Sequence, residues 1–206
     1  MLDPDSLTLV AITDGAQRGT EEIVQRALAC VRGGATMVQL RLKDADARTQ
    51  VEVARALVAA LPLGIPLIMN DRADLAMASG AAGVHLGPED LPVVAARRIL
   101  GPDRIVGLSV GNDAEALEAS GADYVGIGPV YATASKGDAG EAIGVGELER
   151  LTALCARPAV GVGGIDASNA ATVIAAGAHG VAVIRALFSA SDPEAAARSL
   201  RSAIGR

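Results

Sequence analysis

Three polar side chains alternate along one short apolar run and could together bind an anion. Gln39, Arg41 and Lys43 lie two residues apart, so in a β-strand they would share one face. Lys43 is one of only two lysines, with Lys136, in a chain that has 16 arginines. Polar groups facing the interior of a fold are costly unless they line a wet site, which favours an anion and amide clamp over a polar plug.

Two carboxylates follow later apolar runs. Asp71 stands in the segment 70–72, and Asp90 stands in the segment 87–92. Paired carboxylates beside Lys and Arg side chains can hold Mg²⁺ on a phosphate-bearing ligand. Aspartate is also a common helix N-cap, and a helical pattern follows each residue. The spacing alone leaves both interpretations open.

Two further regions have the composition of a phosphate site. A turn-rich segment over residues 128–140 could form a mobile loop that grips phosphate, with an ordinary solvated loop as the alternative. Its candidate groups are Thr133, Ser135 and Lys136. The pairs Gly163-Gly164 and Ile184-Arg185 follow two later apolar runs. Backbone N–H groups at such positions predict a second phosphate contact.

Two single residues carry weaker signals. Ser109 closes an apolar run and could donate a hydrogen bond to an anionic ligand. His85 lies within another run, where we expect a hydrogen-bonded packing residue rather than a base.

The elements that must position these residues repeat along the chain. The pattern Gly-Ala-x-x-Val begins at residues 34, 80, 121 and 177. A helix-like stretch precedes each copy and an apolar run follows it, which predicts a helix, a left-handed glycine, a tight turn and a buried strand. One more run of strand length lies between successive copies.

Eight predicted strands alternate with helices. The strands are residues 7–13, 37–42, 67–69, 83–86, 105–110, 124–130, 159–163 and 181–184. The helices are residues 21–31, 48–61, 73–79, 93–100, 114–120, 147–155, 168–176 and 193–204. This alternation predicts an α/β fold, a closed parallel (β/α)₈ TIM barrel, with residues 1–206 as a single domain. An open doubly wound sheet is the alternative. The four-fold repeat favours closure, because the edge strands of an open sheet need not repeat.

Composition excludes several classes of function. The net charge of −6, the absence of a basic run and the presence of only three aromatic residues argue against a nucleic-acid partner. Every uncharged stretch of about 18 residues contains Gly or Pro, so we expect no membrane span. The acidic N-terminus does not resemble a secretory signal, and Cys30 and Cys155 are expected to be buried, reduced thiols. We therefore expect a cytoplasmic protein.

The candidate residues together resemble the thiamine-phosphate synthase family, and the likeness covers nearly the whole chain. The matching segments are residues 39–43, 70–72, 83–87, 89–92, 121–129 and 163–165. That family joins an aminopyrimidine carrying a diphosphate to a thiazole phosphate, and it releases pyrophosphate and thiamine phosphate. The resemblance implies these two small-molecule substrates as partners, and it leaves a homo-oligomer open.

The resemblance also implies roles for individual residues. Asp71 and Asp90 would hold Mg²⁺. Contacts to the pyrimidine diphosphate are implied for Gln39, Arg41, Lys43, Asn70, Ser109 and Lys136, with Leu40 and Leu42 in the same segment. Contacts to the thiazole phosphate are implied for Thr133, Ala134, Ser135, Gly164, Ile184 and Arg185.

The family's reaction is dissociative, so the residue types suit it. The diphosphate leaves first, the pyrimidine amino group stabilises the resulting methyl cation, and the thiazole nitrogen then attacks. Such a reaction needs no strong general base. It needs cations for the departing charge, and Arg41, Lys43 and Lys136 are the expected catalytic residues.

Three positions depart from the family's usual pattern. Arg185 replaces a small hydroxyl residue, residues 110–113 lack a Thr-His pair, and Ala134 and Ser135 stand where Pro and Thr are common. These departures affect the thiazole side more than the pyrimidine side.

Two other functions are compatible with the fold. A thiazole tautomerase would share the barrel but would need an acid or base and no clamp for pyrophosphate. A non-catalytic sensor of a thiamine precursor is the second alternative. The combination of Asp71, Asp90, Arg41, Lys43 and Lys136 favours the synthase over the tautomerase.

Overall fold

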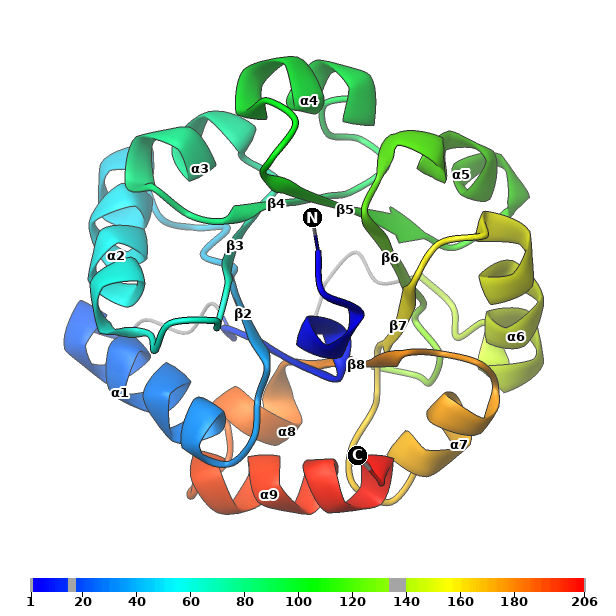
Figure 1. Cartoon of the computed structure of the whole chain (residues 1–206). Coiled ribbons are helices and arrows are strands. Elements are labelled where there is room, and N and C mark those ends of the chain that lie inside the picture. Colours follow the sequence, from blue (N-terminus) through cyan, green and yellow to red (C-terminus); the bar gives the residue numbers. More distant parts are fainter. Residues whose placement is uncertain (1, 15–17, 134–139, 206) are drawn as a thin grey trace.

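The computed structural model describes residues 2–14, 18–133 and 140–205, and it confirms a closed parallel barrel (Figure 1). Each strand from β1 to β8 pairs with the next, and β8 pairs in parallel with β1. Helices surround the strands as an outer ring (Figure 1). This closure excludes the open doubly wound sheet.

Most elements lie where the periodicity predicts them. The strands are β1 (Leu9–Ile12), β2 (Met37–Leu40), β3 (Leu67–Asn70), β4 (Gly83–Leu86), β5 (Ile105–Val110), β6 (Tyr124–Ile127), β7 (Ala159–Val162) and β8 (Gly180–Val183). The α-helices are α1 (Thr20–Arg32), α2 (Ala47–Ala60), α3 (Ala73–Ser79), α4 (Val93–Leu100), α5 (Asp113–Glu118), α6 (Gly144–Cys155), α7 (Ala170–Ala175), α8 (Arg185–Phe188) and α9 (Pro193–Ile204). The 3₁₀ helices within the described ranges are η1 (Pro4–Leu7) and η2 (Ala119–Gly121). None of these helices is long and apolar enough to cross a membrane.

The chain before β1 is helical, although the sequence predicts a strand from residue 7. The Asp3 carboxylate accepts a hydrogen bond from the Asp5 N–H, and Pro4 begins the turn, so a short 3₁₀ helix forms. Leu7 ends this helix and is fully buried with Val10 in the barrel interior. The N-terminal segment therefore closes the end of the barrel opposite the carboxyl ends of the strands.

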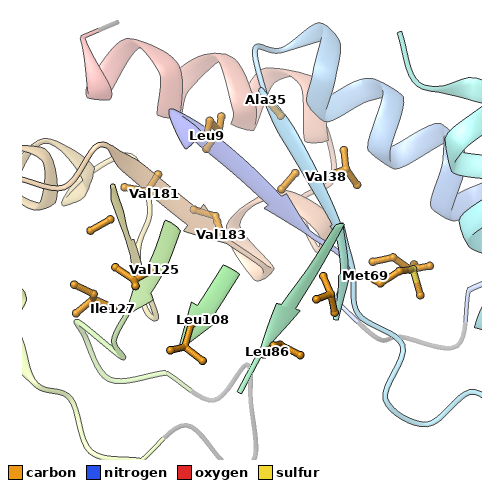
Figure 2. Packing of buried hydrophobic residues seen from close by; sticks show 14 of the residues in the cluster. Leu9, Ala35, Val38, Met69, Leu86, Leu108, Val125, Ile127, Val181 and Val183 are labelled. Atoms are coloured by element: carbon orange, nitrogen blue, oxygen red, sulfur yellow. The ribbon is translucent and has the colours of Figure 1, made fainter. Parts of the chain in front are cut away.

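Alternate strand residues divide the core into two layers. Val10 and Ile12 of β1 pack inside the barrel, whereas Leu9 and Ala11 pack outward against the helices. Figure 2 shows Leu9 with other members of this outer layer. The same alternation turns Gln39 of β2 into the barrel, as its spacing predicts.

The repeated glycines adopt the predicted left-handed conformation in three of the four copies. Gly34, Gly80 and Gly177 have φ angles of 109°, 79° and 91°. The prediction is wrong for Gly121, which ends the 3₁₀ helix η2. The repeats precede β2, β4, β6 and β8, so they mark every second unit of the barrel.

A glycine at the start of β8 allows the close approach of the N-terminal segment, which yields a test of the fold. A Cβ atom on Gly180 would lie 1.9 Å from the carbonyl oxygen of Leu7. We expect Gly180→Ala to lower the free energy of unfolding by about 2 kcal/mol or more, because backbone atoms would have to move.

Gly146 in α6 provides the matched control. A Cβ atom there would meet nothing within 4 Å, and alanine favours a helix over glycine by about 1 kcal/mol. Gly146→Ala should therefore preserve or raise stability. Urea denaturation followed by circular dichroism measures both variants, and equal midpoints would contradict the predicted contact.

Candidate active site

A cavity of about 950 Å³ opens at the carboxyl ends of the strands. Strands β2 to β8, or the segments directly after them, contribute to its wall. The predicted site residues in the wall are Arg41, Lys43, Asn70, Asp71, Asp90, Ser109, Thr133, Gly164, Ile184 and Arg185. The fold thus brings together most of the residues that the sequence singles out.

Three predicted residues within the described part of the chain do not line the wall. Leu40 and Leu42 pack with the outer core, so a ligand in the cavity could meet only their backbone atoms. Gln39 lies deeper, beside a small cavity inside the barrel. Ala134, Ser135 and Lys136 lie outside the described residues.

Asp71 and Asp90 face each other at the rim of the cavity. The Asp71 carboxyl lies close enough to Asp90 for the two charges to interact, and the Asp90 Oδ2 atom accepts the Gly87 N–H at 2.6 Å. Neither residue caps a helix, because α3 begins after Arg72 and α4 begins after Pro92. The structure therefore rejects the helix-cap alternative for both carboxylates.

The positive charges near Asp71 and Asp90 do not fully compensate the two carboxylates. Burial and the neighbouring Asp90 raise the pKa of Asp71 to about 6, and Lys43 and Arg41 offset only part of the shift. Lys43 Nζ lies 4.0 Å from Asp71 Oδ2, at the outer limit of an ion pair. Two carboxylates this close repel each other unless a proton or a cation lies between them.

The donor set fits Mg²⁺ bound together with a phosphate. Within the described ranges no group of three or more His, Cys, Asp or Glu side chains could hold a metal. Mg²⁺ usually binds through one or two carboxylates plus substrate phosphates. Asp71 and Asp90 meet that requirement, since Arg41 and Lys43 line the same cavity and could bind the phosphate.

Arg41 is held at the rim by a hydroxyl group that sequence reasoning assigned no role. Strand β2 ends at Leu40 rather than at the predicted residue 42. The Thr13 hydroxyl then accepts the Arg41 N–H at 2.8 Å and donates to the Arg41 carbonyl at 2.9 Å. These two side-chain hydrogen bonds take the place of the next backbone hydrogen bonds between β1 and β2. Only 8% of Arg41 is exposed, although it lines the cavity, so its position is tightly fixed.

The floor of the cavity contains a polar cluster. His85 Nδ1 lies 3.0 Å from Tyr124 Oη, and His85 Nε2 lies 3.0 Å from Ser109 Oγ. Gln39, on the opposite strand β2, lines a small cavity inside the barrel together with Tyr124 and His85. The expectation that His85 is hydrogen-bonded is confirmed. Tyr124 is the member that sequence reasoning missed, because a tyrosine in an apolar strand has the pattern of an ordinary core residue.

Backbone turns form the opposite wall. Gly163 and Gly164 have φ angles of 96° and 64°, and a Cβ on either would lie within 2.7 Å of the segment after β6, at Pro129 or Tyr131. Both glycines line the cavity beside Arg185, which begins α8. This wall has the exposed amides and the cation that suit a phosphate group.

Glu115 is a further acidic residue in the wall that sequence reasoning missed. Its Oε2 atom accepts the Gly111 N–H at 2.6 Å, and its Oε1 atom accepts from the Asn112 amide at 2.8 Å. It lies on α5, where its spacing resembles that of a solvent-facing helix residue. Its hydrogen bonds hold the turn after β5 in place.

Comparison with known proteins gives one consistent result. The family model for thiamine monophosphate synthase matches residues 9–187. A thiamine-phosphate synthase of Xanthobacter autotrophicus is 52% identical over 99% of this chain and 98% of that protein. One from Azorhizobium caulinodans is 51% identical over 99% of this chain and 98% of its own length.

A solved structure agrees with these relatives. The thiamine phosphate pyrophosphorylase from Pyrococcus furiosus superposes with a TM-score of 0.87 and is 36% identical. The match covers 98% of this chain and 97% of that one.

The raised pKa of Asp71 predicts how stability depends on pH. The folded protein binds the extra proton up to about pH 6, whereas the unfolded chain loses it near 3.8. Wild-type stability should therefore fall as pH rises between these values. Asp71→Asn removes the effect, so without metal it should be more stable than wild type by about 1–3 kcal/mol above pH 6.

Asp74→Asn is the control with the opposite sign. Arg72 hydrogen-bonds Asp74 and lowers its pKa, so this substitution should slightly destabilise the protein above pH 4. Denaturation in EDTA between pH 4 and pH 8 measures the free energy of unfolding of both variants and of the wild type. A difference between Asp71→Asn and wild type that does not change with pH would show that the carboxylates do not repel each other.

Proposed function

Because the chain belongs to the thiamine monophosphate synthase family and has the activity of a thiamine-phosphate synthase, we propose that its cavity binds both substrates side by side. The enzyme is a transferase of thiamine biosynthesis that acts on small molecules. The bond between the pyrimidine methylene carbon and the diphosphate oxygen breaks, and the same carbon then bonds to the thiazole nitrogen. Pyrophosphate leaves with the electron pair.

One observation carries the assignment of the diphosphate end of the cavity. The contact between Asp71 and Asp90 is unfavourable in the absence of a cation, and it lies beside two basic side chains. Asp71 and Asp90 would hold Mg²⁺, which supplies positive charge to the diphosphate when bound. Asn70 lines the same part of the cavity and can donate its amide to the substrate.

Basic side chains complete the clamp for the leaving group. Arg41 is nearly buried, so little solvent screens its charge. The side chain of Lys43 is 43% exposed and can reach outward. Lys136 is the third proposed cation. Together they neutralise charge that develops as pyrophosphate departs, which lowers the barrier without a general base.

The thiazole phosphate occupies the wall made by the glycine turn and α8. Gly164, Ile184 and Arg185 line the cavity together. Thr133 lines it from the segment after β6, and Ala134 and Ser135 follow directly in the sequence. Binding both rings against these fixed groups brings the thiazole nitrogen in line with the methylene carbon.

The arrangement of His85 disfavours the tautomerase alternative. A proton-transfer enzyme needs a basic atom that can reach its substrate. Both ring nitrogens of His85 are already in contact with protein groups, Tyr124 and Ser109.

Loss of one carboxylate tests the metal site. Asp90→Asn should lower kcat/KM at millimolar Mg²⁺ by about 100-fold or more, because the site loses one of two charged ligands. The assay mixes both substrates with and without Mg²⁺ and measures pyrophosphate and thiamine phosphate. Calorimetry with Mg²⁺ and pyrophosphate reports binding separately from turnover.

Asp103→Asn is the matched control. Asp103 is exposed in the turn before β5, at the opposite end of the barrel, and its loss should change neither quantity. Full activity of Asp90→Asn with the same dependence on Mg²⁺ would remove the carboxylate pair from the mechanism.

Replacement of Arg185 tests the thiazole side. Arg185→Ser should raise KM for the thiazole phosphate by about 10-fold or more, since a charge-assisted hydrogen bond contributes about 1.5–3 kcal/mol. KM for the pyrimidine diphosphate should stay unchanged. Arg198→Ser on the surface of α9 is the control. Equal KM values for the thiazole phosphate in wild type and Arg185→Ser would place the phosphate elsewhere.

A further inference from the structure

A row of hydrogen-bonded side chains lies beneath the cavity. It runs from Tyr124 to His85 and then to Ser109, which lie on β6, β4 and β5, and Gln39 of β2 lines a small internal cavity together with Tyr124. Tyr124 is 1% exposed and Gln39 is 3% exposed, whereas Ser109 is half-buried and lines the cavity. The row of side chains therefore begins in the sealed interior of the barrel and ends at Ser109, where a substrate can reach it.

The strand register and two glycines fix the rings in this row of side chains. His85 lies opposite Gly107 on β5, and Gly107 lies opposite Tyr124 on β6. A Cβ on Gly107 would lie 2.3 Å from Tyr124 Cζ and 2.5 Å from His85 Nδ1. A Cβ on Gly126 would lie 3.0 Å from His85 Cε1. The rings thus fill space that the two glycines leave, and a side chain at either position would displace them.

The direction of the hydrogen bonds follows from which groups can donate. Burial raises the pKa of Tyr124, so its hydroxyl keeps its proton. The phenol oxygen lies 3.0 Å from His85 Nδ1, so the buried phenol donor is satisfied when its proton goes to that nitrogen. An imidazole that accepts at Nδ1 carries its proton on Nε2. That N–H donates to the Ser109 oxygen, so the Ser109 proton must point away from His85.

We propose that His85 and Tyr124 are positioning residues that hold the Ser109 hydroxyl as a hydrogen-bond donor toward the cavity. The hydroxyl donates to an acceptor atom of the pyrimidine diphosphate, a step that rests on the function proposed above. A serine without this support could turn its proton toward the imidazole. This row of side chains therefore selects for a substrate that presents a hydrogen-bond acceptor to Ser109 and against one that presents a donor.

The tautomer of His85 can be measured without any substrate. The chain has two histidines, so protein labelled with ¹⁵N-histidine gives two ring spin systems, and His179→Asn assigns them. We expect His85 at neutral pH to carry its proton on Nε2 in wild type. In Tyr124→Phe the Nδ1 atom loses its donor, and the proton should shift toward Nδ1. A wild-type His85 protonated on Nδ1 would overturn the proposal, whatever the activity.

A double-mutant cycle tests whether Tyr124 acts through Ser109. Tyr124→Phe keeps the ring and should lower kcat/KM for the pyrimidine diphosphate by about 10-fold, the loss of one hydrogen bond to substrate. Ser109→Ala should lower it at least as much. The double variant should be no worse than Ser109→Ala alone, because Tyr124 then has nothing to orient. Effects that multiply would overturn the proposal.

Two controls separate this role from a structural one. Ser79→Ala removes another buried hydroxyl, whose partner is the Leu75 carbonyl in α3, and should leave kcat/KM unchanged. KM for the thiazole phosphate should not change in Tyr124→Phe. If wild type makes no thiamine phosphate but shows the Nε2 tautomer, the proposed function fails while the orientation of Ser109 stands. The wild-type spectrum decides the orientation even if Tyr124→Phe does not fold.

Discussion

The contact between two carboxylates at the rim of the barrel is the interaction on which the site depends. Asp71 and Asp90 lie close enough for their negative charges to repel each other, and the Gly87 N–H holds the Asp90 carboxylate in place. The basic side chains of Lys43 and Arg41 offset only part of this repulsion. Under the proposed function, a cation and an anionic substrate would together complete the balance of charge, which would couple metal binding to diphosphate binding.

The barrel supplies the rigidity that this arrangement requires. Its interior is apolar near η1, where Leu7 and Val10 pack, and becomes polar toward the carboxyl ends. Groups that we assign to the pyrimidine diphosphate stand on strands or directly after them, and side chains such as Thr13 fix them from behind. Groups that we assign to the thiazole phosphate lie on turns and on the short helix α8.

Two of the three places where the sequence departs from the family's usual pattern lie in the cavity wall. Residues 110–112 follow the end of β5, and Arg185 begins α8 after β8. Side chains that line a cavity contact the ligand rather than the core, so a change there need not disturb the packing of the barrel. Under the proposed function, Arg185 would add a positive charge for the thiazole phosphate.

The sequence by itself determined the alternation of strands and helices and the closed barrel, and most of the site residues that it predicted line the cavity. Periodicity and glycine repeats report local structure, and parallel strands must bring their carboxyl ends to one rim. Sequence could not separate a metal-binding carboxylate from a helix cap at Asp71, because both interpretations need the same residue at the same spacing. It also placed Leu40 and Leu42 among the site residues, although their side chains turn outward. Only the tertiary structure joined Tyr124, His85 and Ser109, since hydrogen bonds between different strands depend on the register of a closed sheet.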